Sequence, residues 1–477
     1  MKDKSNAWIN GEQKETEAYF QITNPASGEF IALVSNCGSK EVEAAIASAH
    51  SAFHSWKKES ASKRAALLEK WYNLILSHKE ELATLIATEM GKPMKEAIGE
   101  VVYGAAFVKW FAEESRRING DVLPQVGSEN QRMMMWKQPI GVVVAITPWN
   151  FPVAMVTRKV APALAAGCTV VLKPAEDTPL SALRLAELAH EAGIPAGVLN
   201  VVPTLHPAEI SNLLTQHPLV RKISFTGSTP IGKLLMKQAS AGVKKISLEL
   251  GGNAPFIVFD DANIDKAVQG AIASKYRNSG QTCICSNRIM VQKGIYDAFV
   301  EKFSAEISKM TVGPSLEGSY DIGPIINAAG IDKVEELVAE AIENGAKVRV
   351  GGAKHGRGGN FYQPTVLTGV TSKMRCVQEE IFGPVAPILS FDSEDEAVFM
   401  ANNTPFGLAA YFYSSDLSRI YRVAEQLEYG MVGINDTAIS HPAAPFGGVK
   451  ESGIGREGSR YGLDEFLEKK YICLGIE

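Results

Sequence analysis

The sequence has 477 residues, a formal net charge of −5 at pH 7 and 45% hydrophobic residues. A chain of this length exceeds a single ordinary hydrophobic core, so we expect two or three domains. The composition is typical of a globular protein and excludes collagen-like, coiled-coil and disordered classes. Because the charge balance is mildly acidic and no dense lysine or arginine tract is present, we expect no nucleic-acid partner.

The N-terminal segment, residues 1–16, is polar and lacks the apolar core of a secretory signal. The longest apolar stretches are interrupted by Pro148, Arg158 and Lys173 before they reach membrane-spanning length, so we expect no membrane partner and a cytoplasmic location. Six cysteines are too few for a disulfide framework, and none shows the Cys-x-x-Cys spacing of a zinc site. We therefore expect no metal site and leave a chemical role open for at least one thiol.

After a short segment of strand and turn, the first part of the chain follows a helical pattern. Val42, Ala45, Ile46 and Ala49 recur at helical spacing, and a second such stripe covers residues 67–75. From Gly141 onward, short β-branched runs alternate with helical segments, and this alternation predicts a parallel sheet with crossover helices. The strand candidates are residues 141–146, 169–172, 199–202, 222–226 and 244–250.

A second set of strands and helices begins near Phe256 and predicts a second α/β domain. It contains two helical patterns, 264–276 and 331–344, and a strand pattern at 386–391. Residues 447–462 are rich in glycine and charge and have the composition of a long loop. The tail, residues 466–474, alternates imperfectly and is interpreted as a strand that pairs with another element, for which a second subunit is one candidate.

Three polar side chains stand where α/β proteins place their active sites. Cys283 follows a glycine-containing turn after a helical segment, Glu249 ends a β-rich run just before two glycines, and Asn150 follows the first strand of the parallel set. Each has a more ordinary interpretation when it is taken alone. A free cysteine is most often buried and inert, a loop carboxylate is most often solvated, and an asparagine is common in turns.

Together with the sequence motifs around them, these three residues make the chain closely resemble the aldehyde dehydrogenase superfamily, from Ile9-Asn10-Gly11-Glu12 to the last strand. The resemblance implies an aldehyde dehydrogenase-like α/β fold with two Rossmann-like domains and a β oligomerisation arm. It divides the chain into an NAD-binding domain (1–118 and 140–250), a catalytic domain (251–450), and an arm and tail (119–139 and 451–477). Because dimers and tetramers are typical of that family, we expect a homodimer or a homotetramer. The motifs are Pro148-Trp149-Asn150-Phe151-Pro152, Lys173-Pro174-Ala175-Glu176, Phe225-Thr226-Gly227-Ser228, Glu249-Leu250-Gly251-Gly252, Gly280-Gln281-Thr282-Cys283 and Glu380-Ile381-Phe382-Gly383-Pro384.

The resemblance assigns catalytic roles to the same three residues. Cys283 is the nucleophile that adds to an aldehyde carbon, and Asn150 with the Cys283 backbone N–H stabilises the resulting oxyanion. Glu249 matches the glutamate that activates water to hydrolyse the thioester. Because an ordinary thiol has a pKa near ~8.5, we also expect Glu249 or local dipoles to help form the thiolate.

The turn from Gly227 to Gly232 leads from a strand into a helix whose first turn contains a proline, so its N–H groups are placed to attract a pyrophosphate. This turn is not the GxGxxG fingerprint. The resemblance implies a dinucleotide site in which Lys173 and Glu176 hold the adenosine ribose, Glu380 holds the nicotinamide ribose and Phe382 packs beside the nicotinamide. A carboxylate at Glu176 repels a 2′-phosphate, so we favour NAD and leave NADP open. The cofactor-binding candidates are Trp149, Lys173, Glu176, Gly227, Ser228, Leu250, Glu380 and Phe382.

Within the superfamily, the sequence is most similar to succinate-semialdehyde dehydrogenases. In that subgroup, the positions of Arg158 and Arg277 bind the distal carboxylate of the substrate, which a guanidinium can hold bidentately. Ser440 is a further candidate member of this clamp. A structural ion pair is the alternative interpretation for each arginine. The sequence departs from the subgroup at residues 441–444, so glutarate semialdehyde or another short ω-oxo acid remains an alternative substrate.

Cys285 lies two residues beyond the nucleophile, at a position where some subgroup members form a redox-sensitive disulfide. Extended residues i and i+2 stand about 6.6 Å apart, so a disulfide with Cys283 requires a bend; a buried, inert thiol is the alternative. Three other functions stay open for the whole chain. They are a cysteine esterase or acyl hydrolase, a non-catalytic relative, and an acyl-CoA-forming member, although the last generally lacks the glutamate that this chain has.

Overall fold

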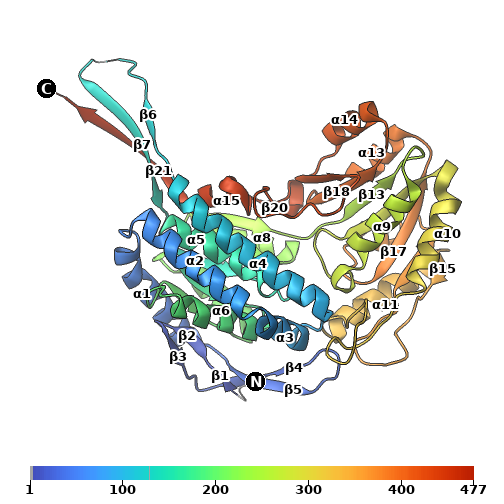
Figure 1. Cartoon of the computed structure of the whole chain (residues 1–477), viewed down its shortest axis with the longest axis horizontal. Helices are drawn as coiled ribbons and strands as arrows, with labels where there is room; N and C mark the ends of the chain where they lie inside the picture. The colour runs from blue at the N-terminus through green and yellow to red at the C-terminus, as the bar shows by residue number, and fades with distance from the viewer. Residues whose placement is uncertain (1–3, 128, 477) are drawn as a thin grey trace.

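The structure is a computed structural model that describes residues 4–127 and 129–476. Figure 1 shows two lobes side by side, one built from the first half of the chain and the other mainly from residues beyond 250, with a β arm that projects from the first lobe. None of the helices among the described residues is long and apolar enough to cross a membrane.

The first lobe is built on an eight-stranded sheet of order β20-β12-β11-β8-β9-β10-β2-β3. Its five central strands are parallel, and they confirm the five predicted strands to within two residues at each end. Every residue of β8 and β9 is buried, as expected for strands covered on both faces. The strands are β2 (Ala7–Ile9), β3 (Glu12–Lys14), β8 (Val142–Ile146), β9 (Thr169–Lys173), β10 (Leu199–Val201), β11 (Val220–Thr226), β12 (Lys245–Glu249) and β20 (Gly453–Ile454).

Helices cover this sheet, and α4 and α5 pack against each other beside the candidate active site (Figure 1). All thirteen residues of α5 are buried, including two cations, Arg158 and Lys159. This helix ends at Gly167, whose φ of +95° is readily accommodated only by glycine. The helices of this lobe are α1 (Ser39–Trp56), α2 (Ala61–Ser77), α3 (Lys79–Glu89), α4 (Met94–Glu114), α5 (Ala154–Ala166), α6 (Pro179–Glu191), α7 (Pro207–Gln216) and α8 (Thr229–Ser240).

The second lobe has a seven-stranded sheet of order β15-β16-β17-β14-β13-β18-β19, which is parallel except at β15. The predicted helices and the strand at 386–391 are confirmed, although α11 begins three residues early because the Asn327 side chain caps its first turn. The strands are β13 (Ala254–Val258), β14 (Ser286–Gln292), β15 (Lys347–Val350), β16 (Thr365–Thr368), β17 (Val385–Phe391), β18 (Ala409–Tyr413) and β19 (Met431–Ile434). The helices are α9 (Ile264–Lys275), α10 (Tyr296–Ile307), α11 (Ala328–Glu343), α12 (Arg375–Gln378), α13 (Glu394–Asn402) and α14 (Leu417–Gln426).

The arm is a three-stranded antiparallel sheet of β6 (Asp121–Leu123), β7 (Gln131–Pro139) and β21 (Leu467–Gly475). The tail strand β21 therefore pairs with β7 of its own chain, from Leu467 opposite Pro139 to Gly475 opposite Gln131. A further small sheet, β1 (Lys4–Ser5), β4 (Tyr19–Thr23) and β5 (Phe30–Ser35), lies at the start of the chain. The domain boundaries and the oligomerising role of the arm stay predictions.

The prediction of a long loop at residues 447–462 is wrong. This segment contains a 3₁₀ turn (Lys450–Ser452), β20, and the start of α15 (Ser459–Asp464). Gly453 pairs with Glu249, and Ile454 with Leu248, so the segment adds a strand to the edge of the first sheet. Its glycine content indicated a loop, but its structure is set by pairing with β12, a strand that lies about two hundred positions earlier in the chain. The segment thereby closes over the end of β12, where Glu249 lies.

Candidate active site

Cys283 and Asn150 line the same cavity, which has a volume of about 380 Å³ and lies between the two lobes. Six of the predicted cofactor-binding residues also line this cavity: Trp149, Gly227, Ser228, Leu250, Glu380 and Phe382. The other predicted residues lie outside its lining. Of these, Glu176 lines a neighbouring surface cavity of about 590 Å³.

The loop before Cys283 has an unusual backbone that is fixed by several contacts. Asn278 and Ser279 have φ values of +52° and +56°, in the left-handed region that non-glycine residues rarely adopt. Gly280 also has a positive φ, and a Cβ there would lie 2.1 Å from the Gly383 oxygen. The Gln281 side chain bonds to Asn278 O at 3.1 Å and to Ile326 N at 2.9 Å. These contacts present Cys283 to the cavity as a half-buried side chain.

Asn150 is buried, and its side-chain Nδ2 donates to the backbone oxygen of Gln281 at 2.9 Å. This bond fixes the orientation of the amide, because a flipped side chain would place two oxygens against each other. The second Nδ2 hydrogen stays available for an oxyanion in the cavity. The Asn150 amide therefore has the orientation that an oxyanion donor needs.

The thiol of Cys283 is held in its neutral form. Burial, together with the negative charges of Glu380 and Glu249, raises its pKa to about 12, although Arg158 acts in the opposite direction. Glu249 therefore does not lower this pKa, and the expectation that Glu249 or local dipoles help to form the thiolate stays a prediction. Arg158 supplies the favourable charge.

Glu249 lies at the end of β12 within electrostatic range of Cys283, but its carboxyl group does not line the cavity. One carboxyl oxygen lies against Gly447, where an added Cβ would approach it to 2.8 Å. The other oxygen is buried without a hydrogen-bond partner among the described residues. Burial and the nearby Glu457 raise the pKa of Glu249 well above its usual value. To act as a base, Glu249 must therefore lose its proton and turn toward the cavity.

Glu457 was missed in the sequence because it lies in the glycine-rich segment that composition assigned to a loop. Its carboxylate forms ion pairs with Arg158, at 2.8 Å, and with Lys159, and all three side chains are at most 7% exposed. Burial acts to raise the pKa of Glu457, but Lys159 and Arg158 together hold it below its usual value. Two adjacent cations in the otherwise apolar helix α5 were the signal that could have indicated a buried anionic partner.

The three predicted substrate residues have different surroundings. Arg158 is buried, bound to Glu457 and 3.9 Å from the ring centre of Phe446, so its charge is already compensated. Arg277 is exposed, and among the described residues no carboxylate lies within ion-pair distance of it. The hydroxyl of Ser440 is hydrogen-bonded to that of Tyr103, a residue that the sequence did not indicate. Of these two arginines, Arg277 is the one that has no ion-pair partner in the part of the chain that the structure describes.

The cofactor end of the cavity fits an extended ligand with a phosphate group. The N-terminal turn of α8 begins at Ser228, whose side chain does not cap it, so its first N–H groups can receive an anion. The buried hydroxyl of Thr226, also in the cavity lining, has no partner among the described residues. At the end of β9, Lys173 Nζ lies 2.9 Å from a carboxylate oxygen of Glu176.

At the nucleophile end, the rings of Trp149 and Phe382 meet edge to face, with 5.6 Å between their centroids. Glu380 accepts the N–H of Gly252 at 3.1 Å, and burial raises the pKa of Glu380 to about 7. Gly252 itself allows a close approach, because a Cβ there would lie 2.4 Å from the Cys283 oxygen. The residues present therefore fit a dinucleotide that extends from Ser228 toward Cys283.

The Cys285 side chain is buried and lies next to α9. Its sulfur is 3.3 Å from Lys275 Nζ and 3.8 Å from Lys275 O. All six cysteines are free in this structure. The redox switch between Cys283 and Cys285 stays a prediction.

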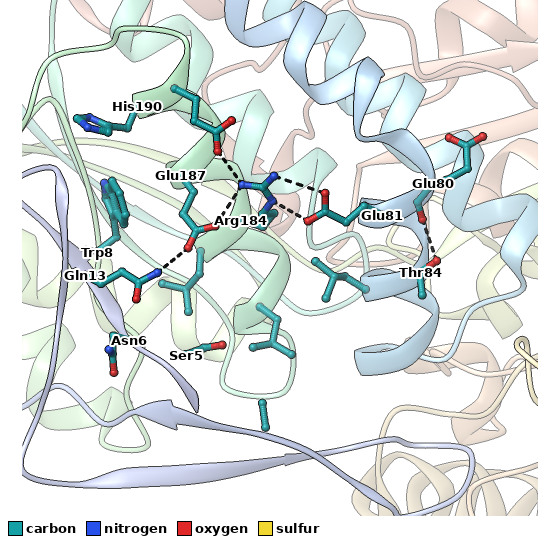
Figure 2. Close-up of a pocket in the computed structure, with 15 residues that line it drawn as sticks. Ser5, Asn6, Trp8, Gln13, Glu80, Glu81, Thr84, Arg184, Glu187 and His190 are labelled. Carbon is teal, nitrogen blue, oxygen red and sulfur yellow. Dashed lines mark hydrogen bonds and ion pairs between the residues drawn. The ribbon is translucent and has the colours of Figure 1, made fainter. Parts of the chain in front are cut away.

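A separate cavity of about 920 Å³ lies between β2, α3 and α6 (Figure 2). At its centre, Arg184 is ion-paired with Glu81 at 2.7 Å, with Glu191 at 2.9 Å and with Glu187 at 3.2 Å. None of the predicted site residues lines it. These ion pairs join α6 to α3, so we interpret the cavity as a structural junction.

The fold and the cavity together define an α/β protein in which a cysteine thiol and a surface that fits a dinucleotide share one cleft. The aldehyde dehydrogenase family matches residues 8–472 of the chain, and the chain belongs to that family. The predicted resemblance and fold class are therefore confirmed.

Individual relatives cover nearly the whole chain. The 3-sulfolactaldehyde dehydrogenase of Pseudomonas putida is 56% identical over 98% of this chain and 95% of its own length. The NADP(+) succinate-semialdehyde dehydrogenase of Escherichia coli (strain K12) is 54% identical over 99% of this chain and 98% of its own. Among solved structures, the succinate-semialdehyde dehydrogenase of Burkholderia pseudomallei has a TM-score of 0.98 at 52% identity, and the alignment covers 99% of this chain and 98% of that one.

Proposed function

We propose that this chain oxidises a short aldehyde with an anionic far end to a carboxylic acid, using NAD and a thioester on Cys283. Succinate semialdehyde is the first candidate substrate. The observation that carries the proposal is the shared cavity of about 380 Å³, which Cys283 and Asn150 line together with six candidate cofactor residues.

The first chemical step is addition of Cys283 Sγ to the aldehyde carbon, for which the thiol releases its proton to solvent. The aldehyde oxygen then becomes an oxyanion, which the free Asn150 Nδ2 hydrogen and the Cys283 backbone N–H are placed to stabilise. When bound, the nicotinamide ring supplies an acceptor for the hydride that leaves the same carbon. Loss of that hydride restores the carbonyl group and leaves a thioester on Cys283.

Hydrolysis of the thioester requires a base. In its deprotonated form, Glu249 takes a proton from water, the hydroxyl oxygen bonds to the thioester carbon, and the carbon–sulfur bond breaks. The products are the carboxylic acid and the Cys283 thiolate, which takes the proton from Glu249 and so regenerates both the thiol and the base. Because Glu249 is buried beside the ion pairs of Glu457 with Arg158 and Lys159, the balance of these charges sets how readily Glu249 loses its proton.

The anionic substrate is supported by Arg277, whose guanidinium carbon lies 4.9 Å from the ring centre of Phe151, the residue after Asn150. Arg277 is exposed and has no carboxylate within ion-pair distance among the described residues, so it is available to bind an anion. The P. putida and E. coli relatives are named for aldehydes with an anionic group, a sulfonate in the first and a carboxylate in the second. The alternatives to succinate semialdehyde are 3-sulfolactaldehyde, glutarate semialdehyde and another short ω-oxo acid.

NAD is the proposed cofactor because Glu176 and Asp177 place two carboxylates after β9. Lys173 helps hold the pKa of Glu176 below its usual value even though burial acts to raise it, so Glu176 is charged and repels a 2′-phosphate. The E. coli relative carries NADP(+) in its name. The alternative is that the protein uses both NAD and NADP, so the assay includes both cofactors.

The test is a turnover assay of the purified chain with NAD or NADP and four aldehydes: succinate semialdehyde, 3-sulfolactaldehyde, glutarate semialdehyde and neutral butanal. We expect growth of the reduced-cofactor absorbance with the anionic aldehydes, and none in Cys283→Ala. A cysteine esterase would instead hydrolyse an activated ester without any absorbance change from these aldehydes. That result would overturn the proposal.

We also propose a cytoplasmic location, since the nucleophile must stay reduced. For assembly, we propose a homodimer or homotetramer formed through the arm. Val122 and Tyr471 in this arm are 81% and 58% exposed, which is unusual for large apolar or aromatic side chains on a strand. Light scattering of the full chain and of a Val122→Lys/Tyr471→Lys variant tests this assignment.

A further inference from the structure

A buried ion pair at the N-terminal end of α4 contacts the backbone of Asn150. Lys92, just before α4, and Glu100, inside it, bond to each other, and both side chains are fully buried. The same Lys92 Nζ donates to the backbone oxygen of Asn150 at 2.7 Å and lies 3.7 Å from the ring centre of Phe151. One ammonium group therefore contacts two consecutive residues of the oxyanion segment.

Glu100 holds the next part of the same segment. One of its oxygens accepts the N–H groups of Val153 and Ala154, at 2.8 Å and 3.2 Å, where α5 begins. A carboxylate at a helix N-terminus satisfies N–H groups that have no partner within the helix. The ion pair thus fixes the chain on both sides of the Asn150–Pro152 turn.

One turn earlier on α4, Glu96 contacts the loop that carries the nucleophile. It accepts the N–H of Asn278 at 2.8 Å, and Asn278 Nδ2 donates to the same Asn150 oxygen at 3.0 Å. Glu96 and Glu100 are four residues apart and share one face of the helix. This face of α4 therefore contacts both segments that must meet at the reacting carbon.

We propose that Lys92 and Glu100 are positioning residues for the oxidation, and that they act by holding the Asn150 amide in line with the Cys283 sulfur. The proposal rests on the proposed function of Asn150 as an oxyanion donor. Neither residue lines the cavity, so neither touches the substrate. The two Asn150 contacts made by Lys92 and by Asn278 decide where its backbone lies, and the backbone decides where its Nδ2 hydrogen points.

If Lys92 had only a structural role, its ammonium group would need no hydrogen bond beyond its ion pair with Glu100. For structural purposes, the Lys92–Glu100 pair is complete without a third partner, since each charge already compensates the other. The ammonium nevertheless directs a charge-assisted hydrogen bond at the one carbonyl group that belongs to the oxyanion residue. Because the acceptor is the backbone oxygen of Asn150, this bond connects the Lys92–Glu100 ion pair to the residue proposed to stabilise the oxyanion.

The decisive variant is Lys92→Met/Glu100→Gln, which removes both charges together and leaves no unpaired buried ion. We expect kcat for the aldehyde to fall about 30-fold, less than the roughly 10²–10³ typical of complete loss of an oxyanion donor. The affinity for NADH, measured by fluorescence, and the rate at which iodoacetamide alkylates Cys283 should stay within about twofold of wild type, because neither depends on an oxyanion. Lys222→Met is the matched control: it removes another fully buried lysine, one that contacts Ser247 and Glu465, and should leave kcat unchanged.

A double-mutant cycle with Asn150→Ala separates positioning from a general structural role. If the ion pair acts through Asn150, removing the pair from the Asn150→Ala variant should lower kcat by less than about a further threefold. Multiplication of the two losses, or a kcat within about threefold of wild type in the pair variant alone, would overturn the inference. Should the pair variant fail to fold, Lys92→Arg keeps a cation opposite Glu100, replaces the ammonium that bonds to Asn150 O and should lower kcat about tenfold, with an unchanged kcat as the contrary result. An inactive wild type would instead refute the proposed function.

Discussion

Asn150 donates a side-chain hydrogen bond to the backbone oxygen of Gln281, 2.9 Å away, and this bond joins the first lobe to the loop of the nucleophile. The two residues are 131 positions apart in the chain. One amide hydrogen is used to hold the loop, and the other stays available to the substrate oxygen. The Asn150 amide and the loop that carries the Cys283 sulfur are therefore held together without a substrate, as the proposed stabilisation of an oxyanion requires.

The pKa of Cys283 predicts a steep pH dependence of its reactivity. Because burial and the nearby carboxylates raise this pKa to about 12, the thiolate fraction should grow about tenfold per pH unit through the neutral and mildly alkaline range. Alkylation by iodoacetamide, followed by mass spectrometry of the Cys283 peptide, measures this rate. A plateau below about pH 9 would contradict the raised pKa. The exposed Cys473 peptide serves as the internal reference.

Replacing Glu249 with Gln should slow hydrolysis of the thioester and spare its formation. The variant lacks the base, so we expect a burst of reduced cofactor near one equivalent per site, followed by a steady rate lower by roughly 10²–10⁴-fold. Stopped-flow absorbance separates the two phases. An unchanged steady rate would mean that another group activates the water. The residues that follow Glu249 in the chain, Leu250, Gly251 and Gly252, carry no carboxylate that could take over its role.

The two arginines should respond differently to substitution. Arg277→Gln removes an exposed, unpaired cation, so KM for succinate semialdehyde should rise about 10- to 100-fold, with little change for butanal. Arg158→Met removes one of the two cations that compensate the buried Glu457, so we expect a loss of several kcal/mol in the free energy of unfolding. Steady-state kinetics and thermal unfolding of both variants test this division. Equal effects of Arg277→Gln on the two aldehydes would refute its anion-binding role.

Much of this site was predictable from the sequence because its residues lie at the ends of strongly patterned strands. β8, β9 and β11 are runs of buried β-branched and apolar residues, and their carboxyl ends carry Asn150, Lys173 and Gly227 close by. The position of Glu457 was not predictable, because it depends on pairing between β20 and β12, far apart in the chain. Lys92 likewise gave no local signal, since its partner Glu100 and its acceptor Asn150 come together only when α4 packs on α5.

The preference for NAD over NADP should depend on the charge of Glu176. Glu176 is ion-paired with Lys173 at 2.9 Å, and its side chain is 41% exposed at the end of β9, where the adenosine ribose is expected. Replacing it with Gln removes the repulsion of a 2′-phosphate and frees Lys173 to attract it, so kcat/KM for NADP should rise about tenfold relative to that for NAD. Initial rates with both cofactors at a saturating aldehyde concentration give this ratio. Glu187→Gln is the matched control, because it removes another partly exposed, ion-paired carboxylate, one that lines the separate cavity around Arg184, and it should leave the ratio unchanged. If Glu176→Gln also leaves it unchanged, the carboxylate does not contact the ribose, and the preference must be set by the neighbouring Asp177 or by the turn at Ser228.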